Sequence, residues 1–203
     1  MKIFAWFALG APVGWLTWQI FREIQLPTSA LGADPGEAVV HYLGIWSLRT
    51  LLIAFAVTPL ARVTGNNALI RLRRMAGLWA YTYVSLHLLA YLFFYVEFSW
   101  AGLLDDVFER SYITVGIGAL LCLTPMALTS TRGWQQRLRR NWKRIHLLVY
   151  PALALGIVHF FWLTRDQYAE VFLYLAVFLL LLVLRLKGVA AFRRRIVSRF
   201  AAR

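Results

Sequence analysis

Apolar residues run along the chain in six long stretches that are separated by short polar connections. A helix needs about 20 mostly apolar residues to cross the hydrocarbon core of a bilayer. Stretches of about that length lie at Ile3–Phe21, Val39–Ala61, Met75–Val96, Tyr112–Thr129, Ile145–Leu163 and Tyr168–Leu186. The pattern therefore predicts an all-α integral membrane protein, a six-helix transmembrane bundle that forms one domain over residues 1–203.

The first stretch also has features of a signal peptide, since Lys2 precedes it and the small residues Ser29 and Ala30 follow it. Its apolar run is longer than an ordinary signal-peptide core, and it carries tryptophans at 6, 15 and 18, which are typical of a retained span. We expect it to remain as a transmembrane helix.

The composition agrees with a membrane protein. Hydrophobic residues make up 61% of the chain and charged residues 15%, against roughly a quarter charged in soluble domains. Cys122 is the one cysteine, which excludes a disulfide framework or an iron–sulfur cluster held by this chain alone. Chemistry is expected among the helices or on short connections, since the sequence lacks nucleotide-binding and hydrolase motifs and shows no repeat at a fixed period.

The charges predict an orientation. Of the 22 basic residues, 18 fall on one side of the six-span arrangement together with both termini, and all nine acidic residues fall on the other. Basic residues favour the cytoplasmic side, so both termini are expected in the cytoplasm. The same bias explains the net charge of +13 through topology and contacts with membrane lipid, without a nucleic-acid partner.

Histidines inside the spans are the strongest candidates for chemistry, because polar groups in a bilayer are costly. His87 lies 13 residues beyond Arg74, and His159 lies 15 residues beyond Arg144. At 1.5 Å per residue, both lie roughly 20 Å from the cytoplasmic edge. Two imidazoles at equal depth on two helices suit the axial positions of one haem iron. The alternative is that each makes an interhelical hydrogen bond and nothing more.

Three other polar residues are open to more than one interpretation. His146 lies near the cytoplasmic edge, where a second haem, a flavin or quinone contact and a simple interfacial histidine all fit. Pro151 should kink this span, so the angle between His146 and His159 is not fixed by spacing. His41 suits the outer interface. Arg49 lies within a span near the depth of His87, which suits a haem propionate, although snorkelling to the interface is the alternative.

These features occur within longer matching stretches that run in order along the chain. They are LGADP at 31–35 with His41 and Gly44, TPLAR at 58–62, LIRLRRMAGLW at 69–79 followed by His87, LTSTRGWQQRL at 128–138, RIHLLVY at 144–150 and His159. On these stretches the chain resembles the ferric-reductase-like transmembrane superfamily of haem proteins. It is most similar to the MsrQ (formerly YedZ) family, the haem-binding membrane subunits of bacterial MsrPQ methionine sulfoxide reductase systems.

The resemblance implies haem b at His87 and His159, with His146 as a disputed extra ligand. In the wider superfamily two haems stack across the bilayer, but here Arg73 and Arg74 stand where an inner ligand would fall. Arginine does not ligate iron, so we expect one haem, in the outer half.

The resemblance also implies FMN toward the cytoplasmic side. Arginines suit its phosphate, and the candidates are Arg71, Arg73, Arg74, Arg139, Arg140 and Arg144. Topology and lipid headgroups account for most of them.

The implied function is electron transfer across the bacterial inner membrane. Electrons would come from the quinone pool or a cytosolic flavin reductase and pass to a periplasmic molybdenum subunit, MsrP, so we assign this chain no catalytic residue. One alternative is a stand-alone transmembrane haem reductase of metal ions or oxygen, fed by a separate cytosolic NAD(P)H-flavin protein. Another is a haem-free transporter or scaffold with structural histidines.

Overall fold

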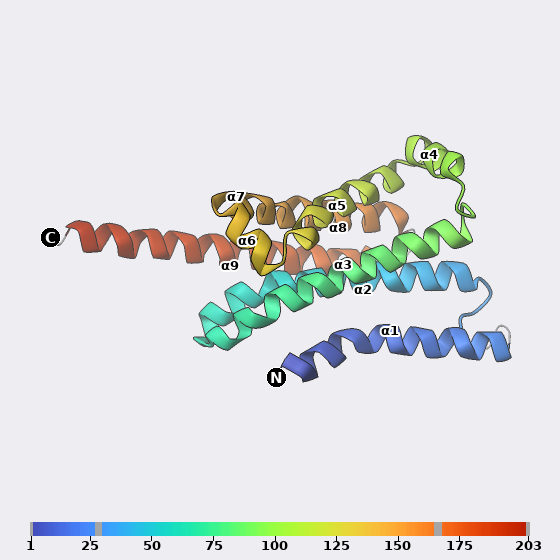
Figure 1. Cartoon of the computed structure of the whole chain (residues 1–203), viewed down its shortest axis with the longest axis horizontal. Coiled ribbons are helices and arrows are strands. Elements are labelled where there is room, and N and C mark those ends of the chain that lie inside the picture. Colours follow the sequence, from blue (N-terminus) through green and yellow to red (C-terminus); the bar gives the residue numbers. More distant parts are fainter. Residues whose placement is uncertain (1, 27–29, 165–167, 202–203) are drawn as a thin grey trace.

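The computed structural model describes residues 2–26, 30–164 and 168–201, with side chains as far as Leu186. All regular elements in these ranges are helices (Figure 1). In chain order they are α1 (Lys2–Gln25), α2 (Pro35–Thr64), η1 (Asn67–Leu69), α3 (Ile70–Phe94), α4 (Trp100–Glu109), α5 (Ser111–Leu128), α6 (Arg132–Leu138), α7 (Arg140–Ile145), η2 (His146–Leu148), α8 (Val149–Leu163) and α9 (Tyr168–Ala201).

The predicted six-helix transmembrane architecture is confirmed. Within the described ranges, six segments are long and apolar enough to cross a membrane, and all six coincide with the expected spans. The chain is a multi-pass integral membrane protein. Short helices α4, α6 and α7 occupy regions that the sequence pattern left as connections or as a span edge.

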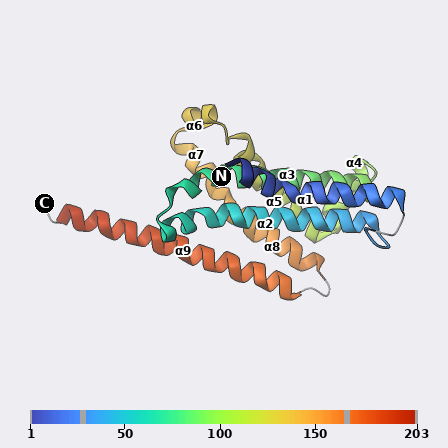
Figure 2. The same ribbon diagram turned by 90° about the horizontal axis from the view of Figure 1, so that it is seen from below.

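Two helix pairs make up most of the bundle. Helices α2 and α3 pack along each other as one antiparallel pair, and α5 packs on α8 as another. Helix α9 lies against α2 and α8, while α1 lies on the outside of α2 and α3 (Figures 1 and 2). Both chain ends lie toward the same end of the bundle (Figure 1).

We call the end that carries η1, α6 and α7 the basic end, and the opposite end, with α4 and the α1–α2 connection, the acidic end. The basic bias predicts that the basic end faces the cytoplasm. Arg165 and Asp166, expected on the outer side, lie outside the described residues.

Local signals explain where the longest span begins and ends. The side chain of Asp34 accepts a hydrogen bond from the Glu37 N–H (2.9 Å), and Pro35 follows at the first helical position of α2. Gly65 ends the helix with φ 69°, a left-handed conformation that suits a residue without Cβ.

Burial separates a small core from a large apolar exterior. Side chains such as Phe55, Tyr83 and Leu153 are fully buried between the helices. Large apolar side chains on the outer faces, including Phe4 and Leu180, are more than half exposed. A soluble protein does not leave this much apolar surface open, whereas lipid covers it in a membrane.

The kink predicted at Pro151 is present. The helix is interrupted by the 3-10 turn η2 at residues 146–148, and regular α-helix resumes only in α8. Proline has no N–H for the carbonyl of Leu147, four residues earlier, and its ring crowds that carbonyl. His146 therefore lies on a different helical segment from His159.

Candidate functional site

His87 and His159 face each other across the bundle. His87 comes from α3 and His159 from α8, two helices of different pairs. Their ring centroids are 6.2 Å apart and the ring planes are nearly perpendicular, at 85°. The equal depth predicted from the sequence thus corresponds to an actual pair.

Hydrogen bonds fix the tautomer of both rings. The Nδ1–H of His87 donates to the carbonyl oxygen of Val40 (2.8 Å), and that of His159 donates to the carbonyl oxygen of Tyr112 (2.7 Å). Because a carbonyl oxygen only accepts, the proton of each neutral ring is on Nδ1 and Nε2 carries a lone pair. Neither Nε2 has a hydrogen-bond partner in the described ranges, so both nitrogens are available as ligands.

Each ring packs against a glycine of the neighbouring helix. A Cβ added to Gly44 would lie 3.1 Å from Nδ1 and Cε1 of His87. A Cβ added to Gly116 would lie 2.9 Å from Nδ1 and 3.0 Å from Cε1 of His159. An added carbon at Gly116 would force the imidazole to shift, whereas at Gly44 the ring would have to give way by only a few tenths of an ångström.

The two half-sites are related by an internal repeat. Val40, Gly44 and His87 each have a counterpart 72 positions later, at Tyr112, Gly116 and His159. The repeat has no fixed period, because the Arg-Leu-Arg-Arg sequences at 71–74 and 137–140 are only 66 apart. We did not predict the glycines or the carbonyls as site residues. The signal that identifies them is a glycine 43 positions before each histidine.

The separation of the two rings fits a metal ion held by two imidazole ligands. Metal–imidazole bonds of about 2 Å, added to the distance from Nε2 to the ring centre, put two such centroids about 6 Å apart. The observed 6.2 Å agrees with this value. A Nδ1–H bond to a backbone carbonyl is also the usual outer contact of a metal-bound histidine. Among the described residues no group of three or more His, Cys, Asp or Glu side chains converges, so the arrangement suits two protein ligands, as in haem.

The other two histidines lie apart from this pair in different ways. His41 packs on Phe160 (ring centroids 6.1 Å apart) and lies close enough to His87 to interact electrostatically. His146 stacks on Trp142 (3.9 Å between centroids), and its Nδ1–H donates to the Trp142 carbonyl oxygen (3.1 Å). The structure thus brings His41 near the candidate site and leaves His146 near the basic end.

Arg49 has protein partners that we did not predict. Its Nη2 lies 2.9 Å from Oε1 of Glu170, and its Nε donates to the hydroxyl of Tyr174 (2.7 Å). The Tyr174 hydroxyl also donates to Glu170 Oε1 (2.6 Å). We considered only a haem propionate and snorkelling for Arg49; the structure adds an acidic partner, because α9 brings Glu170 in its first turn against the middle of α2. A role toward a haem propionate stays a prediction.

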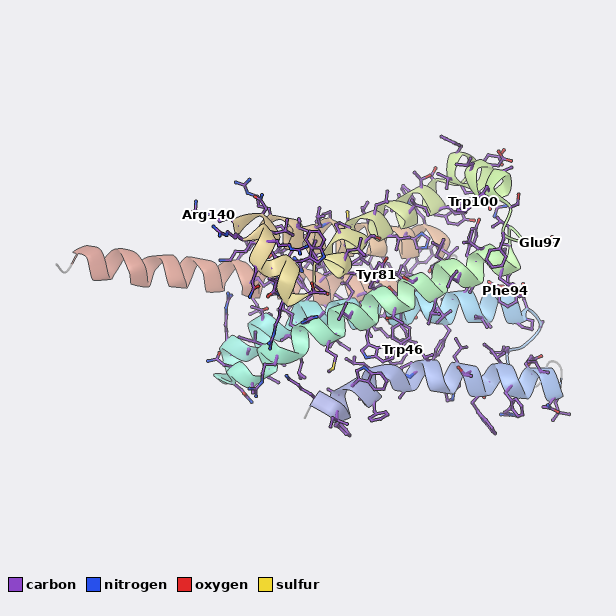
Figure 3. All side chains as sticks on the ribbon, viewed as in Figure 1. Trp46, Tyr81, Phe94, Glu97, Trp100 and Arg140 are labelled. Carbon is purple, nitrogen blue, oxygen red and sulfur yellow. The ribbon has the colours of Figure 1, made fainter. Side chains whose placement is uncertain are left out.

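The arginines predicted to bind FMN differ in burial. The exposed ones are Arg71, Arg74, Arg139, Arg140 and Arg144, and Arg140 extends outward at the basic end (Figure 3). Arg73 alone among the six is partly buried, and it lies within electrostatic range of Tyr150 and Arg185. The structure therefore separates one candidate from five that lie on the surface.

Comparison with known proteins agrees with this geometry. Residues 43–157 match the family model described as ferric reductase like transmembrane component. A protein of Xanthomonas campestris pv. campestris (strain 8004), named protein-methionine-sulfoxide reductase heme-binding subunit MsrQ, is 45% identical over 96% of this chain and 89% of its own length. The chain belongs to the MsrQ branch of the ferric-reductase-like transmembrane family.

Other MsrQ relatives also match over most of the chain. The MsrQ protein of Xanthomonas oryzae pv. oryzae (strain MAFF 311018) is 45% identical over 85% of this chain and 79% of its own length. That of Caulobacter vibrioides is 40% identical over 89% and 83%. No solved structure matches the chain. The segment that matches the ferric-reductase-like family contains Gly44, His87 and Gly116, and it ends two residues before His159.

Proposed function

We propose that this protein is a haem b electron-transfer subunit of the bacterial inner membrane that serves a methionine sulfoxide reductase. The observation that carries the proposal is the His87–His159 pair, with each Nε2 free and the rings 6.2 Å apart. The relatives' names, heme-binding subunits of protein-methionine-sulfoxide reductase, support the same function.

The chain's own residues perform three tasks in this proposal. The two Nε2 atoms would hold the iron, and the Val40 and Tyr112 carbonyls keep each ring in the required tautomer and orientation. Gly44 and Gly116 let the rings approach their helices, so that the ligands are positioned before the cofactor binds. Haem, when bound, supplies a one-electron carrier.

The place of the pair in the bundle supports an outward direction of transfer. His159 is four residues from the end of α8 at Leu163, so the site is closer to the acidic end than to the basic end. We assign the acidic end to the periplasm from the charge bias. The electron acceptor in this proposal is a periplasmic molybdenum subunit, MsrP, which reduces methionine sulfoxide.

The proposed donors are the quinone pool and a cytosolic flavin reductase, with FMN bound toward the basic end. Arginines concentrate there, and Arg73 is the one whose partial burial suits a bound flavin best. Arg49 is retained as a contact for a haem propionate. Its guanidinium uses Nε and Nη2 on protein partners and keeps further N–H donors.

Visible spectroscopy of the purified protein tests the proposal. Dithionite reduction should produce the sharp α band of a six-coordinate b-type haem. We expect His87→Ala and His159→Ala each to remove that band, while the yield of membrane-inserted protein stays unchanged. A normal spectrum in both variants would refute the site.

A second measurement separates this function from a stand-alone reductase. Quinol-driven reduction of methionine sulfoxide by the mixed membrane and molybdenum subunits supports the proposal. Reduction of ferric chelates or oxygen by the membrane subunit with a flavin reductase, without methionine sulfoxide reduction by the mixed subunits, would favour the alternative.

A further inference from the structure

Two partly buried arginines lie within electrostatic range of each other toward the basic end of the bundle. Arg73 lies near the start of α3 and Arg185 lies on α9, and their charges are close enough to interact. Tyr150 of α8 is near both, with its ring centroid 5.9 Å from Cζ of Arg185. His146 is within electrostatic range of Arg73. We call Arg73, Arg185 and Tyr150 the inner cation cluster.

Pro59 explains why Arg185 is held in this position. Proline has no N–H, so the carbonyl of Phe55, four residues earlier on α2, has no helical partner. Arg185 supplies the missing hydrogen bonds, because its Nη2 (2.7 Å) and Nε (3.3 Å) both donate to Phe55 O. Its Cζ also lies 3.8 Å from the centroid of the Phe55 ring. These contacts hold the charge roughly 14 Å from the end of α2 at Thr64, at 1.5 Å per residue.

Arg73, unlike Arg185, has no hydrogen-bond acceptor among the described residues. Within the described ranges it makes no hydrogen bond and no ion pair. It is also the partly buried arginine among the predicted FMN contacts. Two guanidinium charges within electrostatic range of each other in a medium of low dielectric repel each other, and each partly buried charge loses part of its hydration.

Among the described residues, no carboxylate forms an ion pair with Arg73 or Arg185. In the sequence, none of the nine Asp and Glu residues occurs in 38–96, 110–165 or 171–203. Arg49 and Arg110, by contrast, pair with Glu170 and Asp106. The counter-ion of the inner cation cluster must therefore come from outside the chain.

We propose that the inner cation cluster binds a phosphate group between α3, α8 and α9. Arg185 keeps three of its five N–H donors after its two bonds to Phe55 O, and Arg73 keeps all five. Two guanidinium forks suit the several oxygens of a phosphate, and the partial burial strengthens each charge-assisted bond. The proposal is more specific than a general attraction of arginines to lipid, because it names two residues, one of which is held in place by the Phe55 carbonyl.

Two molecules carry such a phosphate at this depth. One is FMN and the other is the headgroup of an anionic phospholipid. The FMN alternative rests on the proposed function. The chemistry that the arginines recognise is the same. The experiment therefore measures both molecules, together with haem, on the same preparation.

The test uses the full-length protein purified in mild detergent. Arg73→Gln is the main variant, because Arg73 makes no hydrogen bond and no ion pair in the described ranges. Arg185→Lys is the second, since a lysine keeps the charge and one bond to Phe55 O but loses the fork. Arg62→Gln is the matched control, an exposed arginine at the basic end of α2. Released flavin, retained phospholipid by native mass spectrometry and haem are each quantified per chain.

We expect Arg73→Gln to weaken binding of one phosphate-bearing molecule at least tenfold and Arg185→Lys to weaken it less, with the control within twofold of the parent. Loss of FMN identifies the flavin, and loss of phospholipid with FMN unchanged identifies the headgroup. Unchanged flavin and phospholipid in both variants would overturn the inference. Loss of haem alone would overturn it as well, since the cluster would then serve a propionate. Failure of the haem proposal is recognised separately, by the His87 and His159 variants.

Discussion

The contact between Gly116 and His159 allows a quantitative prediction for Gly116→Ala. The added methyl carbon would lie 2.9 Å from Nδ1 and 3.0 Å from Cε1 of the imidazole, whereas ordinary contacts begin at 3.4 Å. The ring must therefore move by about 0.5 Å. Because the Nδ1–H bond to the Tyr112 carbonyl is already short at 2.7 Å, a displaced ring both leaves its rotamer and loses the geometry of that bond.

Both effects weaken the ligand. Leaving the rotamer by about 30° costs roughly 0.5–1.5 kcal/mol, and losing a hydrogen bond costs about 1 kcal/mol. A total of about 2 kcal/mol corresponds to roughly 30-fold in an equilibrium constant. Mutations of such outer contacts typically lower metal affinity about 10- to 100-fold. We expect haem affinity to fall within that range for Gly116→Ala, and by only a few-fold for Gly44→Ala, where the added carbon would lie 3.1 Å away.

Gly118→Ala is the matched control on the same helix. Its added carbon would meet only Leu155, at an ordinary 3.5 Å, so haem binding should be unchanged. Alanine also favours a helix over glycine by up to about 1 kcal/mol, so neither variant should unfold α5. Haem titration of the apoprotein, followed at the Soret band, measures the affinity of each. If Gly116→Ala binds haem within twofold of Gly118→Ala, the steric argument is refuted.

Three further predictions concern other contacts. His146→Ala should keep the haem band of the His87–His159 pair, because His146 contacts the basic-end segment; loss of half or more of the haem would show that it is a ligand. Glu170→Gln should destabilise the protein by about 1–2 kcal/mol. This is less than for a fully buried ion pair, because both side chains are partly exposed. A thermal midpoint equal to that of the parent would contradict the Arg49 pairing. Tyr83→Phe removes the 2.7 Å hydrogen bond that Tyr83 donates to Leu9 O, and its loss should cost about 0.5–1.5 kcal/mol of stability. The measurement is the rate of proteolysis of α1, which should rise. Equal cleavage rates would indicate that apolar packing alone holds α1.

The sequence by itself determined the spans, the expected orientation and the identity of the paired histidines. Hydrocarbon requires long apolar helices, so composition and length are enough to find the six spans. A histidine in such a helix is costly, so His87 and His159 stand out without any structure. Pro151 was sufficient to place the break between His146 and His159, because a missing N–H acts on the carbonyl four residues earlier in the same helix.

Only the tertiary structure decided which surfaces of these helices meet. The contacts of His87 with Gly44 and of His159 with Gly116 join residues 43 positions apart, and Arg49 finds Glu170 from 121 positions away. Such contacts depend on the rotation and relative depth of neighbouring helices, which side-chain packing sets. Hydrophobic periodicity carries little of that information, because in a membrane span both the lipid-facing and the buried sides are apolar.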